Sequence, residues 1–199
     1  MRIALLLLAS GLSLTACSRA DDAASGDSLM LGADSTAAPS TMGGDTGAVA
    51  SGPVTAALRD SAGNDLGTLT LMDSGQGVAV AGTLHGLPPG VHAIHIHTTG
   101  SCDAPAFTSA GGHWNPTNRQ HGSENPQGPH FGDMPNITVA ADSTVTVQAT
   151  TPGGTLRGTN ALLDADGAAV MIHGGEDDYR TDPAGDAGDR IACGVIKTP

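Results

Sequence analysis

Residues 92–133 hold six of the eight histidines of this 199-residue chain. They are His92, His95, His97, His113, His121 and His130, and the window ends with Asp133. A buried imidazole needs a hydrogen-bond partner or a metal ion, and a solvated surface has no need for such an ordered run. Scattered surface or core histidines are the alternative interpretation. The density favours a metal site, so the fold must bring this window together.

Short segments of alternating apolar and small or polar residues begin at Pro53. The expected strands are residues 54–58, 66–71, 78–84, 91–97, 137–140, 144–150, 161–163, 168–173 and 191–197. Turn sequences rich in Gly, Asn, Asp, Ser and Pro separate the first four, and no segment has helical periodicity. This spacing predicts an all-β sandwich or barrel.

Two long segments, about 98–135 and about 174–190, interrupt the predicted strands, and connections of that length are usually functional. The chain's aromatic residues are Phe107, Trp114, Phe131 and Tyr179, and all lie outside the predicted strands. We therefore expect an aliphatic core.

The amino terminus is typical of an exported protein. Residues 1–16 combine a short positive start with an apolar run that is too short to span a bilayer, as in a signal peptide. Leu14-Thr15-Ala16-Cys17 resembles the lipobox of bacterial lipoproteins, in which the cysteine becomes acylated after cleavage; an ordinary signal peptide that contains a cysteine is the alternative. Residues 17–52 then form the lipidated cysteine and a flexible Ala/Gly/Ser/Asp tether, and residues 53–199 form the folded domain.

Cysteine count and charge narrow the setting further. If Cys17 is acylated, Cys102 and Cys193 remain as a pair that can form a disulfide outside the cytoplasm or stay as free thiols. The formal net charge is −12, with 20 acidic and 8 basic residues. Such a chain is a poor candidate for binding nucleic acid or anionic lipid surfaces.

The histidines have the spacing of metal ligands. His95 and His97 are two residues apart in a predicted strand, so their side chains project from one face. Loop residues His113, His121, His130 and Asp133 supply further ligands, and His173 ends another strand. Nitrogen-rich ligation favours copper(II), whereas histidines with one aspartate suit zinc. These seven candidates serve two four-coordinate metals only if one imidazole is shared.

Four motifs together resemble the copper/zinc superoxide dismutase family. Residues 90–97 (GVHAIHIH) are similar to its copper-binding strand, and 111–116 (GGHWNP) to its bridging-histidine motif. Residues 121–122 (HG) and 129–134 (PHFGDM) match its zinc loop, and 185–196 (GDAGDRIACGVI) its carboxyl-terminal signature. The resemblance covers about residues 54–197, with the motifs in family order.

The resemblance implies an eight-stranded Greek-key β-barrel with a metal-binding loop and an electrostatic loop. It implies one copper ion per subunit on His95, His97, His113 and His173. It implies one zinc ion per subunit on His113, His121, His130 and Asp133, with His113 as the bridge. Supporting roles follow by the same resemblance: Asp177 links His95 and His121, His92 bonds locally, Arg190 docks the substrate, and Cys102 pairs with Cys193.

The implied reaction is dismutation of superoxide to oxygen and hydrogen peroxide, with His113 carrying a proton to the departing peroxide. We expect an antioxidant enzyme anchored through Cys17 in the bacterial cell envelope, facing the periplasm or the exterior; whether it is a homodimer stays open. The alternative is a non-catalytic copper-binding or copper-delivery lipoprotein on the same fold. One departure from many family members is the stretch 174–189, which carries six acidic residues against Arg180 alone. We therefore expect weak long-range attraction of an anion, with Arg190 and Arg119 acting locally.

Overall fold

A computed structural model describes residues 53–198. The predicted signal peptide (1–16), the predicted acylation site Cys17 and the predicted tether lie outside the described residues. Within 53–198, no helix has the length and apolarity that crossing a membrane requires.

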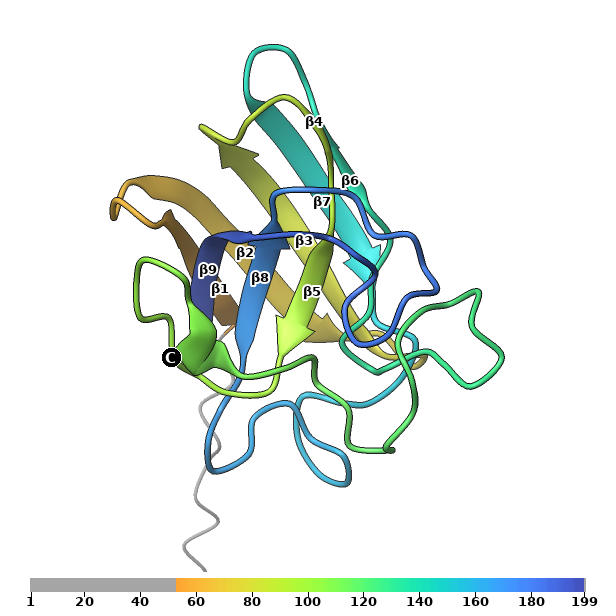
Figure 1. Ribbon diagram of the computed structural model, residues 1–199. Coiled ribbons are helices and arrows are strands. Elements are labelled where there is room, and N and C mark those ends of the chain that lie inside the picture. Colours follow the sequence, from red (N-terminus) through yellow and green to blue (C-terminus); the bar gives the residue numbers. More distant parts are fainter. Residues whose placement is uncertain (1–52, 199) are drawn as a thin grey trace, which may run out of the picture. The chain divides into compact units, whose positions relative to one another are not determined.

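Strands dominate the described part of the chain (Figure 1). They are β1 (Val54–Asp60), β2 (Asp65–Asp73), β3 (Val78–His85), β4 (Gly90–His92), β5 (Ile94–His97), β6 (Ile137–Val139), β7 (Thr144–Thr150), β8 (Ala169–His173) and β9 (Arg190–Lys197). One 3-10 turn, η1 (Thr108–Ala110), lies in the first long loop. Burial alternates along β1 because one face of the sheet covers the core while the other meets solvent.

The strands curl into one antiparallel barrel. Seven of them form a sheet in the order β5-β8-β9-β1-β2-β3-β7, and β4 pairs with β6. The β6–β7 hairpin is held where the Ala140 N–H donates to the Thr144 carbonyl at 2.9 Å. Pairing of β3 with β7 and of β5 with β8 skips sequence neighbours, as Greek-key connections do. The predicted all-β Greek-key architecture is confirmed.

One predicted strand is divided in two. Residues 91–97 form β4 and β5, which pair with β6 and β8 respectively. The break falls at Ala93, whose N–H donates to Gly175 (2.8 Å) and whose carbonyl accepts from His173 (3.0 Å). Because β4 and β5 count as one strand, the nine assigned strands agree with the eight-stranded prediction.

The prediction of a strand at 161–163 is wrong. This stretch makes only an isolated bridge between Thr155 and Ala161. Its backbone bonds go to the same loop, from Leu162 N–H to Thr155 and from Leu163 N–H to Leu156. Leu162 is nevertheless buried, so the apolar residues cover the core from a loop and imitate a strand pattern.

The expectation of a purely aliphatic core is also wrong. Trp114 is only 4% exposed and joins the main core cluster, while Phe107 packs in a second cluster around Cys193. Both lie in the first long loop, which folds back onto the barrel. Gly154 makes room for the indole, because a Cβ there would stand 2.1 Å from Trp114.

The long loops also decide the burial of β5. Ile94 and Ile96 face the main core, as an alternating strand requires. His95 and His97 point the other way, yet both are buried, because the two long loops cover that face of the barrel. The two long loops thus shield the imidazoles of His95 and His97 from solvent.

Candidate metal centre

Four histidines from three segments converge above β5. His95 and His97 come from β5, and His173 ends β8. His113 comes from the first long loop, and its backbone pairs with that of His97 in an isolated antiparallel β-bridge. One ligand atom from each of these residues lies within 4.8 Å of those of the others, and all four residues are buried. The group could hold a metal ion.

The ring nitrogens of this group have an ordered arrangement. One nitrogen of each ring is buried and makes no hydrogen bond: His95 Nδ1, His97 Nε2, His113 Nε2 and His173 Nε2. The opposite nitrogens of three rings donate to acceptors, from His95 to Asp177 Oδ2 (2.9 Å), from His97 to Gly111 O (2.9 Å) and from His173 to Gly188 O (3.2 Å). A carbonyl or carboxylate can only accept, so each outer nitrogen carries the proton and each inner one presents a lone pair.

Electrostatics keep these rings neutral. Burial lowers the pKa of His97 to about 2 and the pKa values of His113 and His173 to about 4. Burial also lowers the pKa of His95, against the opposing effect of Asp177. A neutral imidazole is the form that binds a metal. Orphaned buried lone pairs normally cost free energy, and a bound cation removes that cost.

A second group surrounds the Asp133 carboxylate. Its Oδ1 lies 2.8 Å from His113 Nδ1, 3.1 Å from His121 Nδ1 and 3.3 Å from His130 Nδ1. The His113 and His130 Nδ1 atoms are 3.5 Å apart. Zinc–ligand bonds of about 2.0–2.1 Å give a tetrahedron with edges of about 3.3 Å. Three nitrogens and one oxygen at these separations fit a zinc ion.

Backbone groups and charge fix this second group. Asp133 Oδ2 accepts from the N–H groups of Gly122 and His130, both at 2.9 Å. Burial opposes ionisation of Asp133, but bonds from the three histidines outweigh it and hold the pKa of this carboxyl far below its usual range. Burial likewise lowers the pKa of His121, and the two carboxylates of Asp133 and Asp177 outweigh it and raise the pKa to about 9.

Two residues connect the groups. His113 belongs to both, with Nε2 in the first and Nδ1 in the second. Asp177, only 3% exposed, accepts from His95 Nε2 through Oδ2 and from His121 Nε2 through Oδ1, each at 2.9 Å. The structure therefore brings the seven sequence-predicted ligands and Asp177 into one continuous cluster.

His92 lies outside both groups. Its Nδ1 is 2.9 Å from the His173 carbonyl, and its Nε2 is 2.9 Å from the Pro88 carbonyl. The ring thus connects the turn before β4 to the backbone at the end of β8, the local bonding that the sequence resemblance implies.

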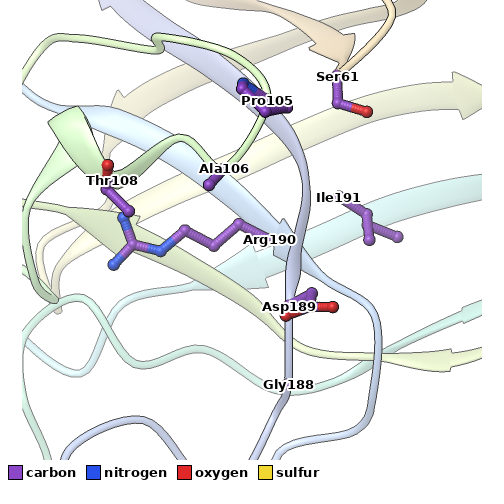
Figure 2. Close-up of a pocket in the computed structure, with 8 residues that line it drawn as sticks. All are labelled: Ser61, Pro105, Ala106, Thr108, Gly188, Asp189, Arg190 and Ile191. Carbon is purple, nitrogen blue, oxygen red and sulfur yellow. The ribbon is translucent and has the colours of Figure 1, made fainter.

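Arg190 stands beside the four-histidine group. Its guanidinium donates to the carbonyls of Phe107 and Gly111, each at 2.7 Å. Arg190 lines a cavity of about 310 Å³ together with His97, His113, His173 and Pro183 among others. Arg190 also lines an open hollow of about 590 Å³, where its side chain extends toward the Thr108 turn (Figure 2).

The predicted disulfide joins Cys102 to Cys193, with Cα atoms 5.7 Å apart. It ties the first long loop, which carries both carbonyl acceptors of Arg190, to strand β9. Cys193 lies three residues after Arg190, so the guanidinium and its acceptors are anchored to the same strand.

Two other arginines, Arg119 and Arg180, do not line the cavities beside Arg190. Arg119 donates to the Gly128 carbonyl inside its own loop, at 2.9 Å from Nε and 2.5 Å from Nη2. Arg180 forms an ion pair with Glu124. Within residues 53–198, Arg190 is the one arginine or lysine that lines either cavity, and it makes no ion pair there.

Sequence reasoning did not identify the residues that hold Asp177 in place. Gly185 packs against its carboxylate, Asn136 bonds to its backbone, and Tyr179 donates its N–H to Oδ1. No periodicity joins these loop positions. The one available signal was Tyr179, the chain's only tyrosine, placed within a polar, acidic segment.

Comparisons with known proteins agree with this geometry. The family model for copper/zinc superoxide dismutase matches residues 66–196. A Cu-Zn superoxide dismutase of Aquifex aeolicus is 48% identical over 138 residues, covering 68% of this chain and 82% of the relative. That of Caulobacter vibrioides is 43% identical over 147 residues, covering 72% and 84%.

Solved structures give the same result. The crystal structure of a double mutant of a SOD-like protein from Bacillus subtilis has a TM-score of 0.70 at 40% identity, covering 72% of this chain and 97% of that chain. The Cu/Zn superoxide dismutase from Brucella abortus has a TM-score of 0.59 at 27% identity, covering 73% and 100%. The chain belongs to the copper/zinc superoxide dismutase family.

Proposed function

We propose that this protein dismutates superoxide to oxygen and hydrogen peroxide at a copper and a zinc ion bridged by His113. His95, His97, His113 and His173 would hold one copper ion, and His113, His121, His130 and Asp133 would hold one zinc ion. The observation that carries the proposal is the set of four buried, unpartnered ring nitrogens beside Arg190.

The chain's own residues supply binding, orientation and protons. Bound copper supplies one-electron oxidation and reduction, while bound zinc fixes and polarises His113. Arg190 offers N–H donors to a small anion in the cavity that it shares with His113. Two superoxide ions and two protons give one oxygen and one hydrogen peroxide molecule. His113 Nε2, whenever it does not bind copper, is placed to hold and deliver one of these protons.

Copper storage or delivery explains less of the site. A delivery protein needs an accessible copper site, but it has no use for a second ligand group that shares His113 or for a cation beside the cavity. The described residues contain all of these features. The dismutase proposal therefore accounts for more of the structure.

Superoxide consumption by the purified full chain tests the proposal, with copper and zinc counted on the same sample. We expect removal in proportion to copper content and its loss in His173→Ala. Full occupancy of both metals without turnover would overturn the dismutase and favour copper handling.

We further propose that residues 1–16 are a cleaved signal peptide and that acylated Cys17 anchors the protein in the cell envelope. Residues 17–52 would then hold the domain away from the membrane, on the periplasmic or exterior side. The disulfide supports an oxidising compartment. Labelling with a radioactive fatty acid tests the anchor, and we expect Cys17→Ser to abolish the label.

Whether the protein is a homodimer is a separate question. Sedimentation velocity in detergent distinguishes a monomer from a homodimer.

A further inference from the structure

Tyr179 lies in the second long loop, and its three polar groups contact Asp177 of the same loop and two other segments. Its backbone N–H donates to Asp177 Oδ1 at 2.7 Å. Its carbonyl accepts from the Glu124 N–H at 3.0 Å, and its hydroxyl accepts from the Asn136 N–H at 2.8 Å. Tyr179 therefore joins the Asp177 carboxylate to the first long loop and to the start of β6.

The backbone conformation of Tyr179 needs this support. Its φ is 61°, in the left-handed region that bulky side chains rarely adopt. The Tyr179 N–H closes an Asx turn with the carboxylate two residues earlier. The Tyr179 backbone lies close against Gly122, since a Cβ built at Gly122 would stand 2.0 Å from the Tyr179 carbonyl oxygen. The hydroxyl contact holds the other end of the side chain.

Asn136 closes a ring of hydrogen bonds with these two residues. Its side-chain amide donates to the Asp177 carbonyl and accepts from the Asp177 N–H, both at 2.9 Å. Asn136 directly precedes β6, which pairs with β4 of the barrel. The ring from Asn136 to Asp177 to Tyr179 and back therefore attaches the second long loop to the rigid sheet.

The ring acts on the metal centre through one carboxylate. Asp177 must present Oδ2 to His95 and Oδ1 to His121 at the same time. Rotation of that carboxylate would remove the acceptor of both outer nitrogens, one in each ligand group. Such acceptors fix ligand orientation and raise ligand basicity. The Tyr179 N–H is the third donor to this carboxylate and restrains its rotation.

We propose that Tyr179 is a positioning residue of the metal centre: its hydroxyl anchors the loop so that its N–H holds the Asp177 carboxylate between His95 and His121. This inference rests on the proposed function in taking the ligand groups as metal sites. It predicts a coupled loss of copper and zinc affinity from a change that touches neither ligand group.

The test measures copper and zinc dissociation constants of the full chain in detergent by competition with chelators, together with the copper(II) absorption spectrum. Tyr179→Phe removes only the hydroxyl. We expect both dissociation constants to rise about tenfold, the lower end of the usual effect for residues that orient ligands, and the spectrum to shift. Thr138→Val removes a hydroxyl from an exposed position of β6 and should leave affinities and spectrum unchanged.

A double-mutant cycle separates positioning from general loosening. In an Asp177→Asn background, Tyr179→Phe should add little, because its effect passes through the missing carboxylate. Wild-type affinity in folded Tyr179→Phe, or an equal loss in both backgrounds, would overturn the inference.

Tyr179→Gly provides a second variant if Tyr179→Phe does not fold, because glycine adopts the left-handed conformation without strain. Unchanged affinity in Tyr179→Gly would also overturn the inference. The readout is metal affinity, so a wild-type protein that binds both metals without turnover refutes the proposed dismutase and leaves this test intact.

Discussion

Gly185 lies directly on the Asp177 carboxylate: a Cβ at Gly185 would stand 1.9 Å from Asp177 Oδ1 and 2.7 Å from His121 Nε2. The second long loop therefore packs at Gly185 against both atoms of the Asp177–His121 hydrogen bond, which helps to link the two ligand groups. Gly185 also has φ 66°, where an added side chain is strained. A single methyl group at this position tests whether the Asp177–His121 hydrogen bond depends on the close packing of Gly185.

Gly185→Ala should lower the affinity for both metals about 10- to 100-fold, because the new methyl group displaces the Asp177 carboxylate from His121. The measurement is chelator competition at constant pH. Gly174→Ala is the matched control in the same loop, since a Cβ there meets its nearest neighbour at 3.5 Å without positive φ. Equal metal affinities for the two variants would show that packing of Gly185 does not constrain Asp177.

Arg190→Glu should reduce kcat/KM for superoxide about tenfold or more while copper and zinc contents stay unchanged. Arg190 is the one arginine or lysine among the described residues that lines the cavity beside the histidines, and the substitution places a negative charge there. Pulse radiolysis measures the rate, and elemental analysis measures the metals. Loss of copper from this variant would mean that Arg190 has a structural role instead.

Arg119→Gln provides the matched control for that experiment. Its guanidinium donates to Gly128 inside its own loop and does not line the cavity. We expect a change in kcat/KM of less than about twofold, because an exposed charge outside the cavity is screened at physiological salt. A loss comparable to that of Arg190→Glu would indicate long-range steering by the loop.

Part of this centre was predictable from local sequence rules. His95 and His97 alternate with Ile94 and Ile96, so a strand had to place both imidazoles on one face. The division of that strand at Ala93 was not predictable, because it depends on bonds to Gly175 and His173 in distant segments.

The loop residues show where such rules end. His113, His121 and His130 lie in a loop without periodicity, and only resemblance to a family assigned them to two groups. Leu162 misled the strand prediction because a loop residue can be as buried as a strand residue. Asn136, Tyr179 and Gly185 act through contacts among the two long loops and the start of β6, and no local sequence pattern encodes these contacts.

The raised pKa of His121 predicts how zinc uptake depends on pH. In the metal-free fold this pKa is about 9, so the ring is protonated at pH 7, whereas a ligand nitrogen must be deprotonated. Zinc binding at pH 7 should therefore release about one proton from His121, and less as the pH approaches 9. Calorimetry in buffers of different ionisation enthalpy measures this release, and zinc uptake without proton release at pH 7 would contradict the prediction.

The same shift has a consequence for the stability of the metal-free protein. Because the folded pKa of His121 lies above its unfolded value of 6.5, its stabilising contribution is fully present below about pH 6.5. It is lost as the pH rises through about 9. Urea unfolding of the metal-free full chain should show this decline, and His121→Asn should remove it.

Removing the disulfide should weaken both the fold and the site. Cys102 and Cys193 are 91 residues apart, and closing a loop of that length stabilises a fold by about 4–5 kcal/mol in the chain-entropy model. Cys102→Ser with Cys193→Ser should lower the free energy of unfolding by about that amount, as measured in urea. Because the tied loop carries both carbonyl acceptors of Arg190, kcat/KM should also fall at full copper occupancy. Full activity in the folded double variant would show that β9 alone positions the guanidinium.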